Sequence, residues 1–293
     1  MRICKTIDEM RATCRAARGG GVRLGFVPTM GALHSGHLSL VRAARASCQV
    51  VAASIFVNPT QFGPQEDLAN YPRSFERDCG LLEKEVVELL FAPTVEEMYP
   101  AGNAVTWVTV DGLSDKLDGR SRPGHFRGVT TVVAKLFHII EPDAAFFGQK
   151  DAAQVAVIRR MVKDLNFAIE IVACPIVREA DGLAMSSRNA YLSAEQRKQA
   201  LVLHGALMRV KKLWEDGERN AVRLADAGRG EMAREKSARL DYFEIVDTNS
   251  LEPVSSAESG SLVAVAAWVG STRLIDNIVL GSKLRRPSGV LKL

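Results

Sequence analysis

The chain has 293 residues, of which 47% are hydrophobic and 25% are charged, with a formal net charge of +4. This composition is typical of a globular protein with one large or two smaller domains and a sizeable buried core. It argues against a strongly basic nucleic-acid binder, the chain lacks an apolar run that could span a bilayer, and the weak positive charge suits an anionic small ligand.

Five cysteines, at positions 4, 14, 48, 79 and 174, fit no zinc-binding spacing. Their odd number and their spacing predict free thiols in a reduced, cytoplasmic protein. Segment 1–20 carries charges throughout and lacks an unbroken apolar stretch, so we expect no signal peptide.

The first elements follow from capping and apolar patterns. Residues 6–9, TIDE, have the spacing of a capping box and predict a helix that runs to the following glycine triplet. The apolar segment 22–29 predicts a strand ended by Pro28, and we expect Ser35 to cap the next helix. Residues 50–58 are nearly all apolar and predict a strand covered on both faces.

Strand and helix patterns then continue to alternate. Helices near 74–86, within 128–140 and from Asp151 each precede an apolar strand segment. Repeated strand–helix–strand units imply an α/β fold with a Rossmann-like, doubly wound, mostly parallel sheet. Ligands bind such sheets at the carboxyl ends of the strands. The loops expected at that edge are 28–37, 58–62, 148–151 and 178–188.

The pattern changes after about residue 190. A long helix over 193–217 is followed by a Glu- and Arg-rich helix that we expect to be broken at 228–230. Three strand-like segments follow, and they predict a smaller α+β C-terminal domain. The boundary lies near 185–190, which gives domains of residues 1–187 and 188–293, and no role is assigned to the basic tail 283–293.

Two histidines, His34 and His37, lie three residues apart in PTMGALHSGHLSL, residues 28–40. They could be metal ligands, a base for a nucleophile, donors to phosphate, or part of a plain turn. Neither a third ligand cluster nor a nucleophile elbow is evident. Gly31 lets the backbone approach a ligand, and the helix N-terminus near Gly36 favours an anion, which supports phosphate binding. The plain turn stays open.

Two further polar corners follow predicted strands. Ser186, Ser187 and Arg188 could donate to phosphate oxygens, although alone they could simply form a loop. Lys150 at a helix start could reach a triphosphate, and Asp151 beside it could cap the helix or hold ribose hydroxyls.

Uncharged amides mark another corner. Asn58 and Gln61 suit a hydroxy-acid substrate, because they orient hydroxyl and carboxylate groups without a fixed charge, and Gln154 lies one turn beyond Lys150 or Asp151. Asp67 and Asp78 could hold Mg²⁺ directly or through water, or could be ordinary solvated acids.

The segments PTMGALHSGH, FVNPTQFG, GVTTVVAKLF, FFGQKD and VREADGLAMSSRN occur in this order. Together they resemble the pantothenate synthetase (pantoate–beta-alanine ligase) family, within the H-x-G-H nucleotidylyltransferase superfamily. The resemblance implies a Rossmann-like N-terminal domain, a smaller C-terminal lid and a homodimer. It also implies an AMP-forming ligation with Mg²⁺, in which ATP and (R)-pantoate give pantoyl adenylate and the amine of beta-alanine then yields pantothenate.

The resemblance also implies roles for individual residues. The catalytic residues would be His34, His37, Lys150 and Arg188, with His37 as the proton donor. Gln61, Gln154 and Asn58 would bind pantoate and beta-alanine. Of the two acids named above, we assign the metal to Asp78 from its place in the sequence. The implied ATP site is Met30, Gly31, Ala32, Leu33, His34, Ser35, Gly36, His37, Gly148, Gln149, Lys150, Asp151, Val177, Met185, Ser186, Ser187 and Arg188.

Two positions depart from the family pattern, because Gln149 and Ala152 stand where the family often has Glu and Tyr. One alternative is a nucleotidylyltransferase that adenylates another small hydroxy acid or a phosphate ester. Another is a regulatory nucleotide-binding module, against which the full set of triphosphate donors argues. An RNA-binding role would call for a basic appendage, which is not visible, so we expect neither a nucleic-acid nor a membrane partner.

Overall fold

The computed structural model describes residues 1–64, 66–102 and 104–281, and the basic tail 283–293 lies outside them. Its larger sheet has six strands in the order β1-β4-β3-β2-β5-β6, and each pair is parallel. After β2 the chain adds β3 and β4 on one side of β2, and then crosses to the other side to form β5. This crossing creates a topological switch point between β2 and β5. The strands are β1 Arg2–Cys4, β2 Leu24–Thr29, β3 Val50–Ile55, β4 Leu89–Phe91, β5 Ala144–Gly148 and β6 Glu170–Cys174.

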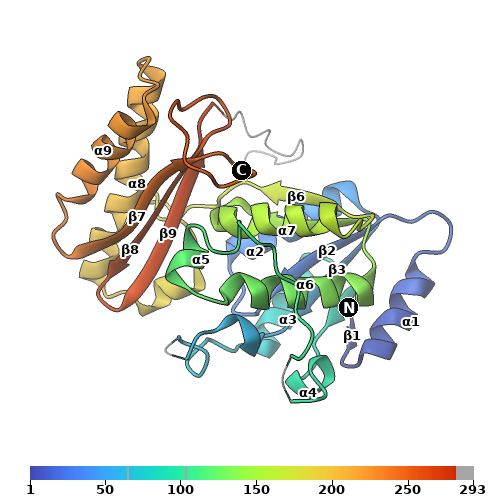
Figure 1. The fold of residues 1–293 in the computed structure, drawn as a ribbon. Helices are drawn as coiled ribbons and strands as arrows, with labels where there is room; N and C mark the ends of the chain where they lie inside the picture. Colours follow the sequence, from blue (N-terminus) through green and yellow to red (C-terminus); the bar gives the residue numbers. More distant parts are fainter. Residues whose placement is uncertain (65, 103, 282–293) are drawn as a thin grey trace.

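Helices cover both faces of this sheet (Figure 1). Helices α1, α6 and α7 pack into the apolar core on one face, and α2 and α3 pack into the core on the other. The structure therefore confirms the predicted doubly wound α/β fold. The helices are α1 Ile7–Ala17, α2 Ser35–Ser47, α3 Phe75–Lys84, α4 Val95–Met98, α5 Asp118–Ser121, α6 His125–Ile140 and α7 Ala152–Asp164, with short 3-10 turns η1 Pro59–Gln61, η2 Gln149–Asp151 and η3 Ser187–Tyr191.

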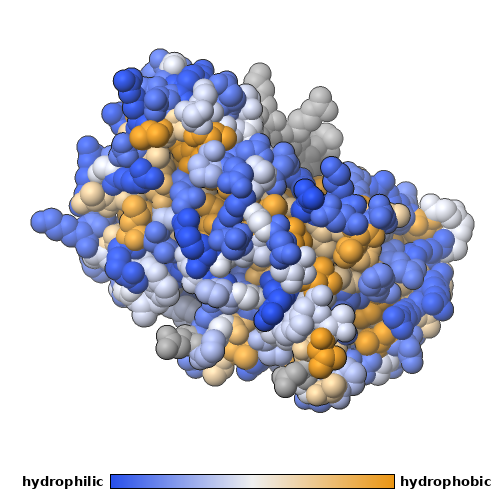
Figure 2. Space-filling view, viewed as in Figure 1, coloured by the Kyte–Doolittle hydropathy of each residue, from blue (hydrophilic) through white to orange (hydrophobic). Residues whose placement is uncertain are grey.

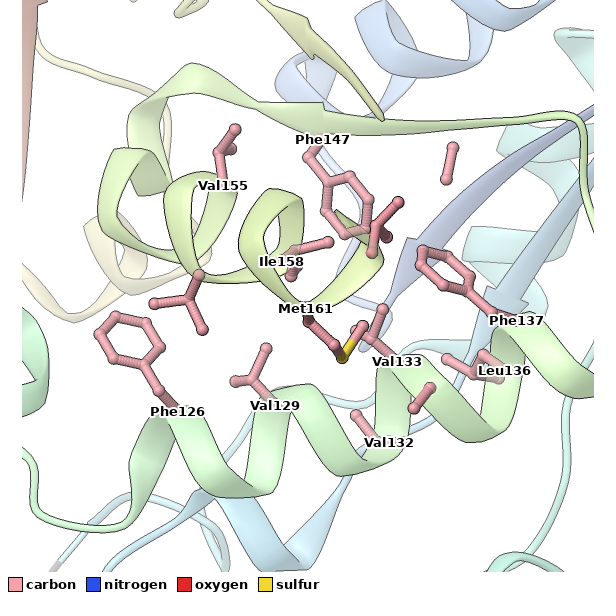
Figure 3. Close-up of a cluster of buried hydrophobic side chains, with 14 of the residues drawn as sticks. Phe126, Val129, Val132, Val133, Leu136, Phe137, Phe147, Val155, Ile158 and Met161 are labelled. Carbon is pink, nitrogen blue, oxygen red and sulfur yellow. The ribbon is translucent and has the colours of Figure 1, made fainter. Parts of the chain in front are cut away.

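The core between α6 and α7 also supports the site. In Figure 3, apolar side chains of α6 point toward Phe147 of β5 and toward Ile158 and Met161 of α7. Three of these α6 side chains, Val129, Val132 and Val133, also line the main pocket of the protein. The pocket wall is thus continuous with a close-packed interior, which keeps it rigid.

The smaller domain has a three-stranded antiparallel sheet, β7-β8-β9, as predicted. Helices α8 and α9 pack on one face of the sheet, and the other face joins the core of the larger domain. Leu183 already packs with α8 and α9, while the exact boundary near 185–190 stays a prediction. The elements are α8 Ala194–Glu215, α9 Ala221–Met232, β7 Ala238–Val246, β8 Leu262–Val269 and β9 Thr272–Val279.

Local details confirm one expected cap and correct three other expectations. Thr6 and Glu9 form the predicted capping box of α1, but β2 continues one residue past Pro28 to Thr29, and His34 rather than Ser35 caps α2. The expected break at 228–230 is also wrong, because α9 runs through it. A Cβ on Gly228 would lie 2.2 Å from Cζ of Phe243, so this glycine allows close helix–sheet packing.

All five cysteines are free, and four of them are buried. Hydrophilic residues cover most of the face in Figure 2, and hydrophobic residues lie in several patches between them. Among the described residues, no helix combines the length and the apolar character that crossing a membrane requires.

Candidate active site

The main pocket lies at the carboxyl ends of β2 and β5, beside the switch point of the large sheet, as expected for this topology. The structure brings together there most of the residues that the sequence singled out. Those that line the pocket are Met30, His34, Gly36, His37, Asn58, Gln61, Gly148, Lys150, Asp151, Gln154, Val177, Met185, Ser186, Ser187 and Arg188.

The two histidines cap their own helix. Nδ1 of His34 accepts a hydrogen bond from the backbone N–H of Gly36 at 3.1 Å. Nδ1 of His37 accepts one from the backbone N–H of His34 at 3.3 Å. Since a donor occupies each Nδ1, the neutral rings carry their proton on Nε2, where it can be donated to a ligand. A Cβ on Gly36 would lie 2.8 Å from the His34 ring, so this arrangement requires glycine.

Both imidazoles are neutral at physiological pH. Burial lowers the pKa of His37 to about 3, and any positive charge on His34 lowers it further. Burial also lowers the pKa of His34 to about 4, with a second contribution from the Lys150 ammonium. The two rings therefore act as hydrogen-bond donors through Nε2–H, while Lys150 supplies the positive charge.

The turn before α2 depends on a buried carboxylate. Asp78 accepts the backbone N–H groups of Ala32 at 2.7 Å and Leu33 at 2.9 Å, while Gly31 has a φ of 84°. Asp78 is 0% exposed. This corrects the expected magnesium role of Asp78, because its oxygens hold the turn and do not face the pocket. Of the implied ATP site, Gly31, Ala32, Leu33, Ser35 and Gln149 lie outside the pocket lining.

Lys150 and Arg188 bring positive charge to the pocket. Lys150 Nζ lies 3.3 Å from Asp151 Oδ1. Burial raises the pKa of Asp151, but the nearby Lys150 and Arg188 charges outweigh it and the pKa is lowered overall. Asp151 makes no side-chain capping bond to α7. Arg188 pairs with Asp67 through two contacts of 3.2 and 2.9 Å, so Asp67 is an ion-pair partner and not a free acid.

The amide end of the pocket is held by a buried network. Asn58, 1% exposed, donates to Gln61 Oε1 at 3.0 Å and to the Gly128 carbonyl at 3.2 Å. Tyr99 and Thr60 both donate to its Oδ1 at 2.9 Å. Asn58 therefore orients Gln61, and its own amide is fully engaged within the protein.

Sequence reasoning missed Arg122 and His125, which line the same end of the pocket. Nη1 of Arg122 lies 3.0 Å from Nε2 of His125, and Arg122 also pairs with Glu66 at 2.6 Å. His125 Nδ1 lies 2.8 Å from the Gln61 carbonyl, and burial lowers the pKa of His125 to about 4. Arg122 precedes α6 and His125 begins it, so neither residue follows a strand, where site residues were expected. The cluster of Arg, Gly and His at residues 119–128 is the sequence feature that could have indicated them.

Within residues 1–64, 66–102 and 104–281, no group of three or more His, Cys, Asp or Glu side chains is placed to hold a metal ion. The pair His34 and His37 lacks a third protein ligand in that part of the chain. The geometry therefore fits donation to an anionic ligand better than metal ligation.

Comparisons with known proteins agree with this chemistry. Residues 2–279 match the family model described as pantoate-beta-alanine ligase. Pantothenate synthetase of Koribacter versatilis is 65% identical over 280 residues, which is 96% of each chain. That of Thermotoga neapolitana is 58% identical over 281 residues, 96% of this chain and all of the relative.

Two solved structures extend the match. Pantothenate synthetase from Thermus thermophilus superposes with a TM-score of 0.90 at 48% identity, over 95% of this chain and 99% of that one. Pantoate-beta-alanine ligase from Francisella tularensis, complexed with beta-gamma ATP and beta-alanine, superposes with a TM-score of 0.77 at 33% identity. The match covers 98% of this chain and 100% of that one.

Proposed function

The chain belongs to the pantoate–beta-alanine ligase family and is a ligase that condenses pantoate with beta-alanine to give pantothenate, and from this premise we propose how its residues carry out the reaction. The observation that carries the proposal is one pocket with two chemically different ends. Neutral histidines, Lys150 and residues 186–188 are the lining residues that we assign to the phosphates of ATP and call the phosphate end, and the amides of Gln61 and Gln154 are those that we assign to pantoate and call the amide end.

In the first step, a carboxylate oxygen of (R)-pantoate attacks the α-phosphorus of ATP. A new P–O bond forms, the bond to the leaving pyrophosphate breaks, and pantoyl adenylate results. Such a displacement needs alignment and stabilisation of charge on the phosphate oxygens more than covalent catalysis. The Nε2–H groups of His34 and His37 would donate to these oxygens, with His37 as the proton donor, and Lys150 and Arg188 would balance their charge.

In the second step, the amine of beta-alanine attacks the acyl carbon of the adenylate. The C–O bond to AMP breaks, the amine loses a proton, and pantothenate forms. Gln61 and Gln154 would orient the pantoyl group, with Gln61 beside beta-alanine as well. The apolar wall from α6 would exclude water from the reactive adenylate.

We propose Mg²⁺ as the cofactor. Mg²⁺ in such sites is held by one or two carboxylates together with substrate phosphates, and it neutralises phosphate charge. Asp151 is the carboxylate in the pocket lining, and its lowered pKa keeps it ionised. The residues present therefore fit an ion that arrives with ATP.

We also propose a homodimer and a cytoplasmic location. The family resemblance supports the dimer, and the free thiols support a reducing compartment. Light scattering on a gel-filtration column tests the oligomeric state, and a molar mass of one chain would contradict the dimer.

Product analysis tests the proposed reaction. The protein is incubated with ATP, Mg²⁺, (R)-pantoate and beta-alanine, and each component is omitted in turn. We expect AMP, pyrophosphate and pantothenate only in the complete mixture, apart from a small amount of enzyme-bound adenylate, with an equal amount of pyrophosphate, when beta-alanine alone is omitted. ADP as the product, or equal turnover with other small hydroxy acids, would contradict the proposal.

A further inference from the structure

Strand β9 of the small domain carries two adjacent polar residues with buried side chains. Asp276 is 4% exposed and Asn277 is 3% exposed. Buried polar groups of this kind require hydrogen-bond partners. The backbone N–H of Asn277 donates to Asp276 Oδ1 at 2.7 Å within β9. The other partners of the two side chains lie outside the small sheet, on the two segments that carry the residues of the phosphate end.

Asn277 holds the first of these segments, η2. Its Nδ2 donates to the backbone carbonyl of Gln149 at 3.0 Å and to that of Lys150 at 2.9 Å. Its Oδ1 accepts a longer bond from Gln149 Nε2 at 3.3 Å. One side chain thus fixes two consecutive peptide carbonyls, and these peptides carry Lys150 and Asp151 into the pocket.

Asp276 holds the second segment, over residues 177–188. Its two oxygens accept from the two terminal nitrogens of Arg178 at 2.7 and 2.9 Å. Arg178 also donates to the Gly182 carbonyl at 3.1 Å and pairs with Ala184 in an isolated β-bridge. These contacts fix the hairpin that leads directly into residues 186–188.

We call η2 and residues 177–188 the two walls of the phosphate end. Side chains alternate between the two faces of a strand, which explains how the neighbouring residues Asp276 and Asn277 reach different walls. Asp276 pairs with Val265, which lies in the core beneath α8 and α9. Asn277 pairs with Ala264, which lies in the core shared with the larger domain. β9 is an edge strand, and Figure 1 shows it as the strand of the small sheet nearest to the larger domain. It therefore lies between the two walls.

We propose that Asn277, supported by Asp276, is a positioning residue for the ATP site. It sets the distance and orientation of Lys150 and Asp151 relative to residues 186–188. Since both walls are attached to one strand, withdrawal of the small domain would release both walls together. The inference rests on the proposed function of this pocket and assigns β9 a part in it.

The donor groups of Asn277 give the proposal a specific signature. Asn277→Asp keeps the size and shape of the side chain but replaces the N–H donors with carboxylate oxygens that face two carbonyls. Buried carbonyls left without donors are costly, and a facing negative charge adds to the cost. Asn277→Ala removes the same bonds without adding charge. If donation matters, the Asp variant is at least as impaired as the Ala variant.

The test measures KM for ATP and kcat in pantoate-dependent ATP–pyrophosphate exchange, together with thermal melting. We expect both Asn277 variants to raise KM for ATP on the order of 10-fold or more, with a smaller change in KM for pantoate. Arg178→Lys keeps a positive charge beside Asp276 but loses the two-point contact. We expect it to raise KM for ATP several-fold. This second variant tests the proposal even where the Asn277 variants fold poorly.

The matched control is Lys116→Met. Lys116 joins the two domains away from the pocket, through the Ser250 carbonyl at 3.0 Å and through Glu252. We expect its KM for ATP to stay close to that of the unmodified protein. An equal rise in this control would mean that β9 only docks the domains, and would overturn the proposal.

Near-normal kinetics of the Asp variant would also overturn the proposal, because the side chain would then merely fill space. Exchange by the unmodified protein is measured first. Absence of pantoate-dependent exchange there would contradict the proposed function itself, which separates the two failures.

Discussion

The two ends of the pocket are stabilised in different ways. At the phosphate end, His34 and His37 satisfy the first N–H groups of their own helix, so this part of the site is held by contacts within four residues. At the amide end, Asn58 connects Gln61 to Gly128 and Tyr99, residues that are far apart in the chain. A local motif thus orients the two histidines of the phosphate end, whereas contacts between distant residues orient Gln61 at the amide end.

This difference separates charge stabilisation from substrate recognition. Damage at the phosphate end should remove catalysis and leave the fold largely intact, because its functional groups point into the pocket. Damage at the amide end should affect pantoate binding and stability together, since Asn58 and Gly128 are buried among their partners. Substitutions at each end can test this separation.

The largest effect is expected from Lys150→Ala and His37→Ala. Each removes a group that stabilises charge on the phosphates, so exchange should fall roughly 100-fold or more. Circular dichroism should show an unchanged fold. The matched control is Lys163→Ala. Lys163 is an exposed lysine on α7, the helix that follows Lys150, and its variant should retain full exchange. Normal exchange in either pocket variant would refute the assigned role.

Asn58→Ala should have the next largest effect. It removes the hydrogen bonds that Asn58 makes with Gln61 Oε1, Tyr99 and the Gly128 carbonyl, at a cost of about 1–3 kcal/mol in the free energy of unfolding. KM for pantoate should rise at least about 10-fold for the same reason, while the affinity for ATP changes little. Isothermal titration with ATP and with pantoate separates the two, and equal losses for both ligands would contradict the division of the pocket.

Gly128→Ala should act at the same end through packing alone. An added Cβ would lie 2.3 Å from the Thr60 carbonyl oxygen, so η1 and its Gln61 must shift. Overpacking of this kind costs about 1–3 kcal/mol, and KM for pantoate should rise several-fold. Gly205→Ala is the control, because a Cβ added at Gly205 would meet no neighbouring side chain or loop within 4 Å. It should bind pantoate normally.

The smallest effect on activity near neutral pH is expected from protonation of the two histidines, which instead affects stability in acid. The folded pKa values of about 4 for His34 and about 3 for His37 lie below the ordinary value of 6.5. Below pH 6.5 the unfolded chain therefore binds protons that the folded chain does not, and the fold loses stability as pH falls toward 4. The contribution is fully present above pH 6.5. Urea melts of His37→Gln should show a weaker loss over this range, and an unchanged loss would contradict the burial of neutral His37.

The parts of the site that the sequence predicted are those with local causes. A glycine-bent turn after a buried strand and a helix start with two histidines are visible within ten residues, and the switch-point rule then placed Lys150 near them. The capping role of His34 was missed, because side chains other than Ser, Thr, Asp and Asn are rarely expected there.

The parts that the sequence did not predict depend on distant contacts. From the sequence pattern, Asp78 is only an acidic residue near the start of a predicted helix. Its hydrogen bonds to the backbone of the turn at residues 31–33 become visible only in the fold. Arg122 and His125 reach the pocket because α6 packs against η1 at Gly128. The unbroken α9 likewise follows from packing against Phe243, which overrides the low helix propensity of glycine.

The most direct test of the account follows the oxygen that joins its two ends. In the proposed reaction, a carboxylate oxygen of pantoate, held at the amide end, attacks the α-phosphorus at the phosphate end and leaves with AMP. With pantoate labelled by ¹⁸O in its carboxylate, mass spectrometry should find one labelled oxygen in each AMP formed. AMP free of label, with pantothenate still produced, would contradict the account.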